Sequence, residues 1–186
     1  VYDAAPSYLV QRLYLTPSDF DGQRTLSWTI AAPGIETSLQ HRDAFGNTAH
    51  LLTVRGHSGP LLVTCGGEVE TEDRSGVVKG IASSIPEAVF LRHTTATQLS
   101  PALTEVLRRF DRKKPVLETA HQIMDDVHAA VAYETGSTHA HTTASEAFSD
   151  GRGVCQDHAH IMIALARGLG LPARYVTGYL VTGTGA

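Results

Sequence analysis

The chain has 186 residues, and 42% of them are hydrophobic, which is enough for the core of one large domain or two modest ones. Its 15 basic and 19 acidic residues give a formal net charge of −4, so it has no broad positive field for a phosphate backbone or an anionic membrane. No apolar run approaches the roughly 18 residues of a membrane span, and the start lacks a signal segment. We therefore expect a cytoplasmic protein without a nucleic-acid or membrane partner.

The two cysteines, Cys65 and Cys155, are too few and too far apart for a disulfide framework, which favours a reducing compartment. Cys65 stands at the end of an apolar run, before two glycines. We expect it to be a small hydrophobic residue buried in the core, with no functional role.

The first half of the chain reads as short β-strands separated by turns. The expected strands are 9–15, 25–31, 50–54, 61–65 and 68–72, and Gly, Pro, Asn and Asp residues lie between them. This spacing predicts an antiparallel β-sandwich over residues 1–90, followed by a linker at about 85–99.

The second half, residues 98–186, has helical periodicity. Expected helices begin at Ser100-Pro101 and at Pro115, at the capping-box sequence 143–146 and at or just before Cys155; the last ends at 168–170, before a strand at 173–180. Helices followed by a strand predict an α+β core.

Cys155 stands at a position that favours reactivity. It is on the first turn of the last helix and follows two glycines that let the backbone approach a substrate. The amides and the dipole of a helix start favour the nucleophilic thiolate, and the same N–H groups could hold an oxyanion. A cysteine on an apolar helix face is otherwise an ordinary core residue, so position alone leaves both interpretations open.

Three motifs in order carry a family resemblance. The sequences GRGVCQDHAH at 151–160 and GLPARYVTGYL at 170–180, with HAHTTASEA at 139–147 upstream, strongly resemble the bacterial transglutaminase-like cysteine proteases. LYLTP at 13–17 and HRDAFGN at 41–47 resemble the β-rich domain that precedes the core in this family. The resemblance covers nearly the whole chain.

The resemblance implies a papain-like core in which Cys155 pairs with a histidine and an aspartate on following strands. Those strands are expected beyond residue 186, so we expect the core to be truncated here. The implied chemistry is cysteine-dependent acyl transfer on a peptide or protein amide, by hydrolysis first and by transfer to an amine second. It needs no cofactor, and the sequence has no acidic loop for calcium.

Neighbouring polar residues admit further roles. Gln156 and Asp157 are candidates for supporting the helix start or for positioning substrate. His158 replaces the aromatic residue common in the family, and is conceivable as a substitute base or as a solvent-facing residue. Zinc bound by Cys155 and some of His139, His141, His158 and His160 is a weaker hypothesis, because 158 and 160 point to opposite sides of a helix.

Two further hypotheses concern the chain as a whole. Without the partner histidine and aspartate it could serve as a non-catalytic interaction or binding module on the same fold. An unpaired edge at 173–180 would also favour a homo-oligomer joined through that strand.

Overall fold

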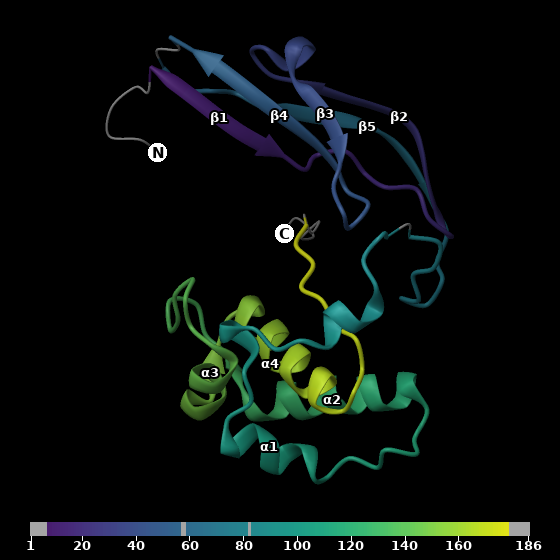
Figure 1. Ribbon diagram of the computed structural model, residues 1–186, viewed down its shortest axis with the longest axis vertical. Coiled ribbons are helices and arrows are strands. Elements are labelled where there is room, and N and C mark those ends of the chain that lie inside the picture. Colours follow the sequence, from purple (N-terminus) through teal and green to yellow (C-terminus); the bar gives the residue numbers. More distant parts are fainter. Residues whose placement is uncertain (1–6, 57–58, 82, 179–186) are drawn as a thin grey trace, which may run out of the picture. The chain divides into compact units, whose positions relative to one another are not determined.

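The computed structural model describes residues 7–56, 59–81 and 83–178. The chain divides into two units, Val1–Ile85 and Pro86–Ala186 (Figure 1). Strands dominate the first unit, and every α-helix of the described residues lies in the second. The α+β class predicted from the sequence is confirmed. No helix within these described ranges is long and apolar enough to cross a bilayer.

The first unit contains two antiparallel sheets. In one, β4 (Thr48–Arg55) lies between β1 (Tyr8–Leu13) and β3 (Leu39–Arg42); in the other, β2 (Gln23–Ala31) pairs with β5 (Thr64–Thr71). In place of the strands expected at 61–65 and 68–72, β5 begins at Thr64 and runs through both glycines. β3 was not predicted, because three of its four residues are polar.

The expected burial of Cys65 is wrong, because the residue is exposed. It lies on β5, where only Val69 is partly covered, and it pairs with Ile30 in a sheet of two strands. Of the residues described in this unit, the buried hydrophobic ones are Ala49, Leu52 and Val54. So small a core leaves most of β5 in contact with solvent.

The second unit is built around one central helix. α4 (Cys155–Gly168) packs against α1 (Pro101–Leu107), α2 (Val116–Ala130) and α3 (Ala144–Asp150) (Figure 1). The helix starts agree with the sequence prediction. Buried aliphatic and aromatic side chains from all four helices and the adjoining loops form the core: Leu103, Val106, Leu107, Phe110, Ile123, Val127, Val131, Ala144, Ala147, Ile161, Ala164, Leu165 and Ala166.

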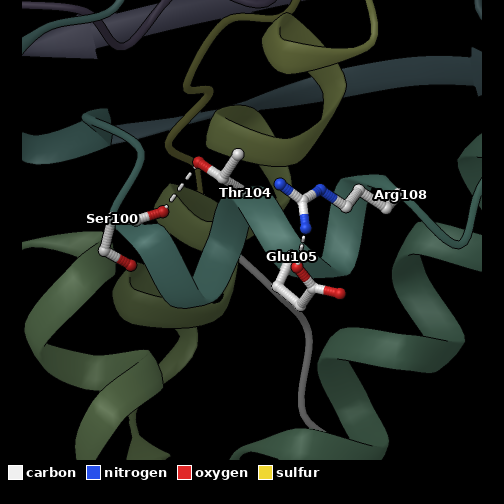
Figure 2. A network of polar contacts seen from close by, with 4 residues as sticks. All are labelled: Ser100, Thr104, Glu105 and Arg108. Carbon is white, nitrogen blue, oxygen red and sulfur yellow. Dashed lines mark hydrogen bonds and ion pairs between the residues drawn. The ribbon is translucent and has the colours of Figure 1, made fainter.

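The first turn of α1 shows how local sequence sets a helix start. The Ser100 hydroxyl accepts the Leu103 N–H at 3.2 Å, and the Thr104 hydroxyl donates to the Ser100 carbonyl at 2.9 Å. Figure 2 shows the latter bond and the exposed ion pair of Arg108 with Glu105, 2.6 Å apart. The bond from the Leu103 N–H satisfies one of the backbone donors that a helix start leaves open.

The segment expected to be a linker packs within the second unit. It contains two short 3₁₀ helices, η2 (Glu87–Leu91) and η3 (Thr95–Thr97). The Arg167 guanidinium of α4 donates to the carbonyls of Arg92 and Ala173, both at 2.7 Å, and to the Thr97 hydroxyl at 3.1 Å. Burial lowers the pKa of Arg167 below its ordinary value. This cation therefore joins the segment before α1 to the segment after α4.

The strand expected at 173–180 is not present where the structure describes it. Residues 173–178 have no regular secondary structure, and 179–180 lie outside the described residues. The Ala173 N–H donates to the Phe90 carbonyl at 3.1 Å, which holds the beginning of this segment. Tyr175 and Val176 are exposed by 42% and 73%.

Candidate nucleophile site

Cys155 is the first residue of α4 and is exposed. Among the described residues, no hydrogen bond involves its thiol. A thiol at this position sits where helix amides converge and where a reagent or substrate can reach it. The geometry therefore has the two features that a nucleophilic cysteine needs at a helix start.

The turn before Cys155 is fixed to the segment that follows α2. Gly151 ends α3 in the left-handed conformation, with φ of 65°. β7 (Arg152–Gly153) then pairs in parallel with β6 (Ala132–Tyr133). The Ala132 N–H donates to the Gly151 carbonyl at 2.8 Å, and the Glu134 N–H donates to the Gly153 carbonyl at 2.9 Å. The backbone that leads into the nucleophile is thus held on one side.

Asp157 holds the same turn from inside the unit. Its side chain is fully buried, and Oδ2 accepts the Val154 N–H at 2.8 Å and the Thr138 hydroxyl at 2.6 Å. Its Oδ1 is buried without a hydrogen-bond partner among the described residues. Of the two predicted roles, these contacts support the one at the helix start, and full burial leaves no surface for direct contact with substrate.

Gly153 leaves room for that carboxylate. A Cβ at position 153 would lie 2.7 Å from the Asp157 Cβ and 2.8 Å from its Oδ2, closer than real side-chain contacts allow. The sequence suggested that this glycine lets the backbone approach a substrate. The structure gives it a different task, which is to let a buried acidic residue pack beneath the turn.

Gln156 reaches the loop between β6 and α3. Its Nε2 donates to the Ala140 carbonyl at 3.3 Å. Both candidate positioning residues therefore bind the 134–142 loop, Gln156 through Ala140 and Asp157 through Thr138. Sequence reasoning did not identify Thr138, because its importance appears only through a partner 19 residues away.

His158 turns both ring nitrogens toward backbone carbonyls. Nδ1 lies 2.9 Å from the Val154 oxygen and Nε2 lies 3.0 Å from the Val131 oxygen. A neutral imidazole has one N–H, so only the protonated ring can donate to both carbonyls at once. The ring is partly buried and joins the end of α2 to the start of α4. The His158 ring is therefore neither a base directed at Cys155 nor a solvent-facing side chain, which were the two possibilities predicted from the sequence.

The other histidines do not gather around the thiol. His139 and His141 are exposed on the loop, with ring centroids 6.4 Å apart, and His160 packs 5.4 Å from the ring of Tyr175. The part of the chain that the structure describes contains no group of three or more His, Cys, Asp or Glu residues that could hold a metal ion. The geometry thus offers no support for the zinc hypothesis.

The loop ends in the capping box predicted at the start of α3. The Glu146 carboxylate accepts the N–H and the hydroxyl of Thr143, both at 2.8 Å. The backbone hydrogen bond from Thr143, then its side-chain bond and the nearby His139, lower the pKa of Glu146 below its ordinary value of 4.5, although desolvation acts against them. The loop is therefore anchored at its far end as well.

Two family models match this chain. Residues 104–185 match the core of the transglutaminase-like superfamily, and residues 1–70 match the bacterial transglutaminase-like N-terminal region. The site described above lies wholly within the first match. The second covers most of the β-rich unit.

Further comparisons cover nearly the whole chain. An uncharacterized protein of Mycobacterium leprae is 24% identical over 188 residues, which cover 97% of this chain and 67% of that protein. Uncharacterized proteins of Mycobacterium bovis and Mycobacterium tuberculosis are 28% identical, covering 92% of this chain and 60% of theirs. The crystal structure of a "putative cysteine protease" from Cytophaga hutchinsonii superposes with a TM-score of 0.67 at 20% identity, over 91% of this chain and 61% of that one. The chain thus spans about two thirds or less of the length of these relatives.

Proposed function

Because the chain belongs to the transglutaminase-like superfamily, we propose that it carries the nucleophile of a cysteine-dependent acyl transfer on amide bonds. The observation that supports this most directly is the exposed thiol of Cys155 at the start of a buried helix. Its substrate class is a peptide or protein amide. Both cysteines are free, which fits a reducing, cytoplasmic compartment.

In the proposed first step, the thiolate sulfur attacks the amide carbonyl carbon and the C–O electron pair moves onto oxygen. The N–H of Cys155, at the start of α4, is the proposed donor to that oxyanion. Collapse of the tetrahedral intermediate breaks the C–N bond. The amine then leaves with the proton that the histidine proposed below has taken from the thiol, and the acyl group remains on Cys155 as a thioester.

The second step returns the thiol. Water attacks the thioester in a hydrolase, and an amine attacks it in a transglutaminase; we favour water. The proton acceptor and its orienting carboxylate are proposed to be a histidine and an aspartate from sequence that follows residue 186. His158, which the sequence suggested as a substitute base, has both ring nitrogens directed at backbone carbonyls, so we do not assign it this role.

Acylation with an activated ester tests the nucleophile without requiring the natural substrate. The chain is incubated with p-nitrophenyl acetate, and the acetylated cysteine is located by peptide mass, in wild type, Cys155→Ser and Cys65→Ser. We expect the adduct at Cys155 to form faster than at Cys65, although both side chains are exposed. Equal rates at the two cysteines would remove the support that the helix start gives to this proposal.

The same experiment addresses the alternative of a non-catalytic binding module. Turnover is followed with the protein extended by its natural flanking sequence, with water alone or with added glycine amide as acceptor. Release of acetate supports hydrolysis, and formation of N-acetylglycine amide supports transfer. A Cys155 adduct that persists under both conditions in the extended protein supports the binding module.

A further inference from the structure

We infer that the 134–142 loop is a fixed wall beside the Cys155 thiol and that Asp157 and Thr138 are a positioning pair that holds it closed. This inference rests on the proposed function, because it assigns the loop to the surface that a substrate of Cys155 meets. It concerns access to the nucleophile and adds no chemical step.

The loop is attached on both sides of Cys155. On the side before the nucleophile, the Glu134 N–H donates to the Gly153 carbonyl at 2.9 Å, and the Arg152 and Glu134 side chains lie 3.6 Å apart. On the side after it, the Gln156 amide and the Asp157 carboxylate bind the loop at Ala140 and Thr138, at 3.3 and 2.6 Å. A segment bound to both neighbours of the thiol lies beside it.

Asp157 is the strongest of these attachments. It is the one ionisable side chain among the buried residues of the described ranges, and burying a carboxyl group is costly unless donors compensate. A cap for α4 alone could stand in solvent, as Glu146 does for α3. The second bond of Asp157 reaches inward to Thr138, which lies on the loop. The burial of Asp157 is therefore explained by its role as a link between the first turn of α4 and the wall.

The wall presents polar groups to its surroundings. His139, Ala140 and His141 are exposed. The His141 N–H donates to the His139 Nδ1 at 3.3 Å, so the ring proton of neutral His139 belongs on Nε2. That N–H is a donor on the exposed part of the wall.

The test compares reagents of different size in a Cys65→Ser background. Rates of Cys155 alkylation by iodoacetamide and by the bulkier N-phenylmaleimide are measured at one pH, and their ratio is taken. Both reagents attack the thiolate, so the ratio cancels any change in ionisation and reports access alone. Amide hydrogen exchange over 137–142 is followed in parallel. The variants are Thr138→Val and Asp157→Asn, with Thr138→Ser as the conservative rescue.

Ser137→Ala is the matched control, because the Ser137 hydroxyl bonds within the same loop, to the Glu134 carbonyl at 2.7 Å, and not to Asp157. We expect Thr138→Val to accelerate exchange over 137–142 by about tenfold, the effect of losing one hydrogen bond to a carboxylate. Asp157→Asn should accelerate it less, because the amide oxygen can still accept the Thr138 hydroxyl. The rate of N-phenylmaleimide divided by the rate of iodoacetamide should rise in Thr138→Val and Asp157→Asn. It should stay near the wild-type value in Thr138→Ser and Ser137→Ala.

An unchanged ratio in Thr138→Val, with folding intact, would overturn the inference that the loop is a wall beside the thiol. A change in melting temperature without a change in the ratio would do the same, since it would leave only a structural role. If instead Cys155 is never acylated by p-nitrophenyl acetate while the ratio responds as expected, the proposed function fails and the wall stands. The two failures are therefore distinguishable.

Discussion

Replacing Gly153 with alanine tests the packing beneath the nucleophile. The new Cβ would meet Asp157 atoms at 2.7 and 2.8 Å, so the carboxyl group must move away from Val154 and Thr138. Overpacking costs about 1–3 kcal/mol, and a weakened hydrogen bond to a charged acceptor adds about 1.5–3 kcal/mol. We expect the second unit to lose about 3 kcal/mol or more, which lowers its melting temperature by about 10–20 °C for a domain of this size.

The two units offer separate signals for this measurement. The α-helices of the described residues lie in the second unit, so circular dichroism at 222 nm follows that unit. The single tryptophan, Trp28, lies on β2 in the first unit, and its fluorescence is the internal control. Gly178→Ala is the matched variant, because a Cβ there meets no atom of the described residues within 4 Å. If the helical transitions of Gly153→Ala and Gly178→Ala had the same melting temperature, the description of Asp157 beneath the turn would be refuted.

Two further predictions use the same signals, and a third uses light scattering. Arg167→Met should lower the helical transition by about 1–3 kcal/mol, because several acceptors lose a charged donor, and leave Trp28 fluorescence unchanged; an unaltered helical transition would contradict this. The pKa of Glu146 is lowered in the folded state, so its contribution is present above pH 4.5 and is lost as the pH falls through the folded value. Glu146→Gln should therefore flatten the acid side of the stability profile, and an unchanged slope would exclude the capping contribution. Val176, 73% exposed beside Tyr175, should support self-association at micromolar concentration, which Val176→Asp would abolish; a wild-type monomer by light scattering would contradict it.

The features that the sequence predicted are those encoded by neighbours. Ser100-Pro101 and the Thr143 to Glu146 capping box mark their helix starts within four residues, and Cys155 was placed on the first turn of α4 by the glycines before it. The motifs around Cys155 were also sufficient to predict the family of the chain.

What escaped prediction depends on distant partners. His158 was weighed as a base, but Val131, 27 residues earlier, takes one of its nitrogens. The burial of Asp157 depends on Thr138, which no motif distinguishes from an ordinary loop residue. Cys65 was expected to be buried because its strand is apolar at the start, yet burial depends on a second layer to cover it, and β2 and β5 form a sheet of two strands.

The contacts described around Cys155 come from one short stretch of chain. The most distant of them joins Val131 to His158, so the turn, the loop and the helix start are assembled within 28 consecutive residues, counting both ends of that 27-residue separation. Such a module has little loop-closure entropy to overcome and can form early in folding. A single insertion between β6 and α3 would therefore disturb the setting of the thiol.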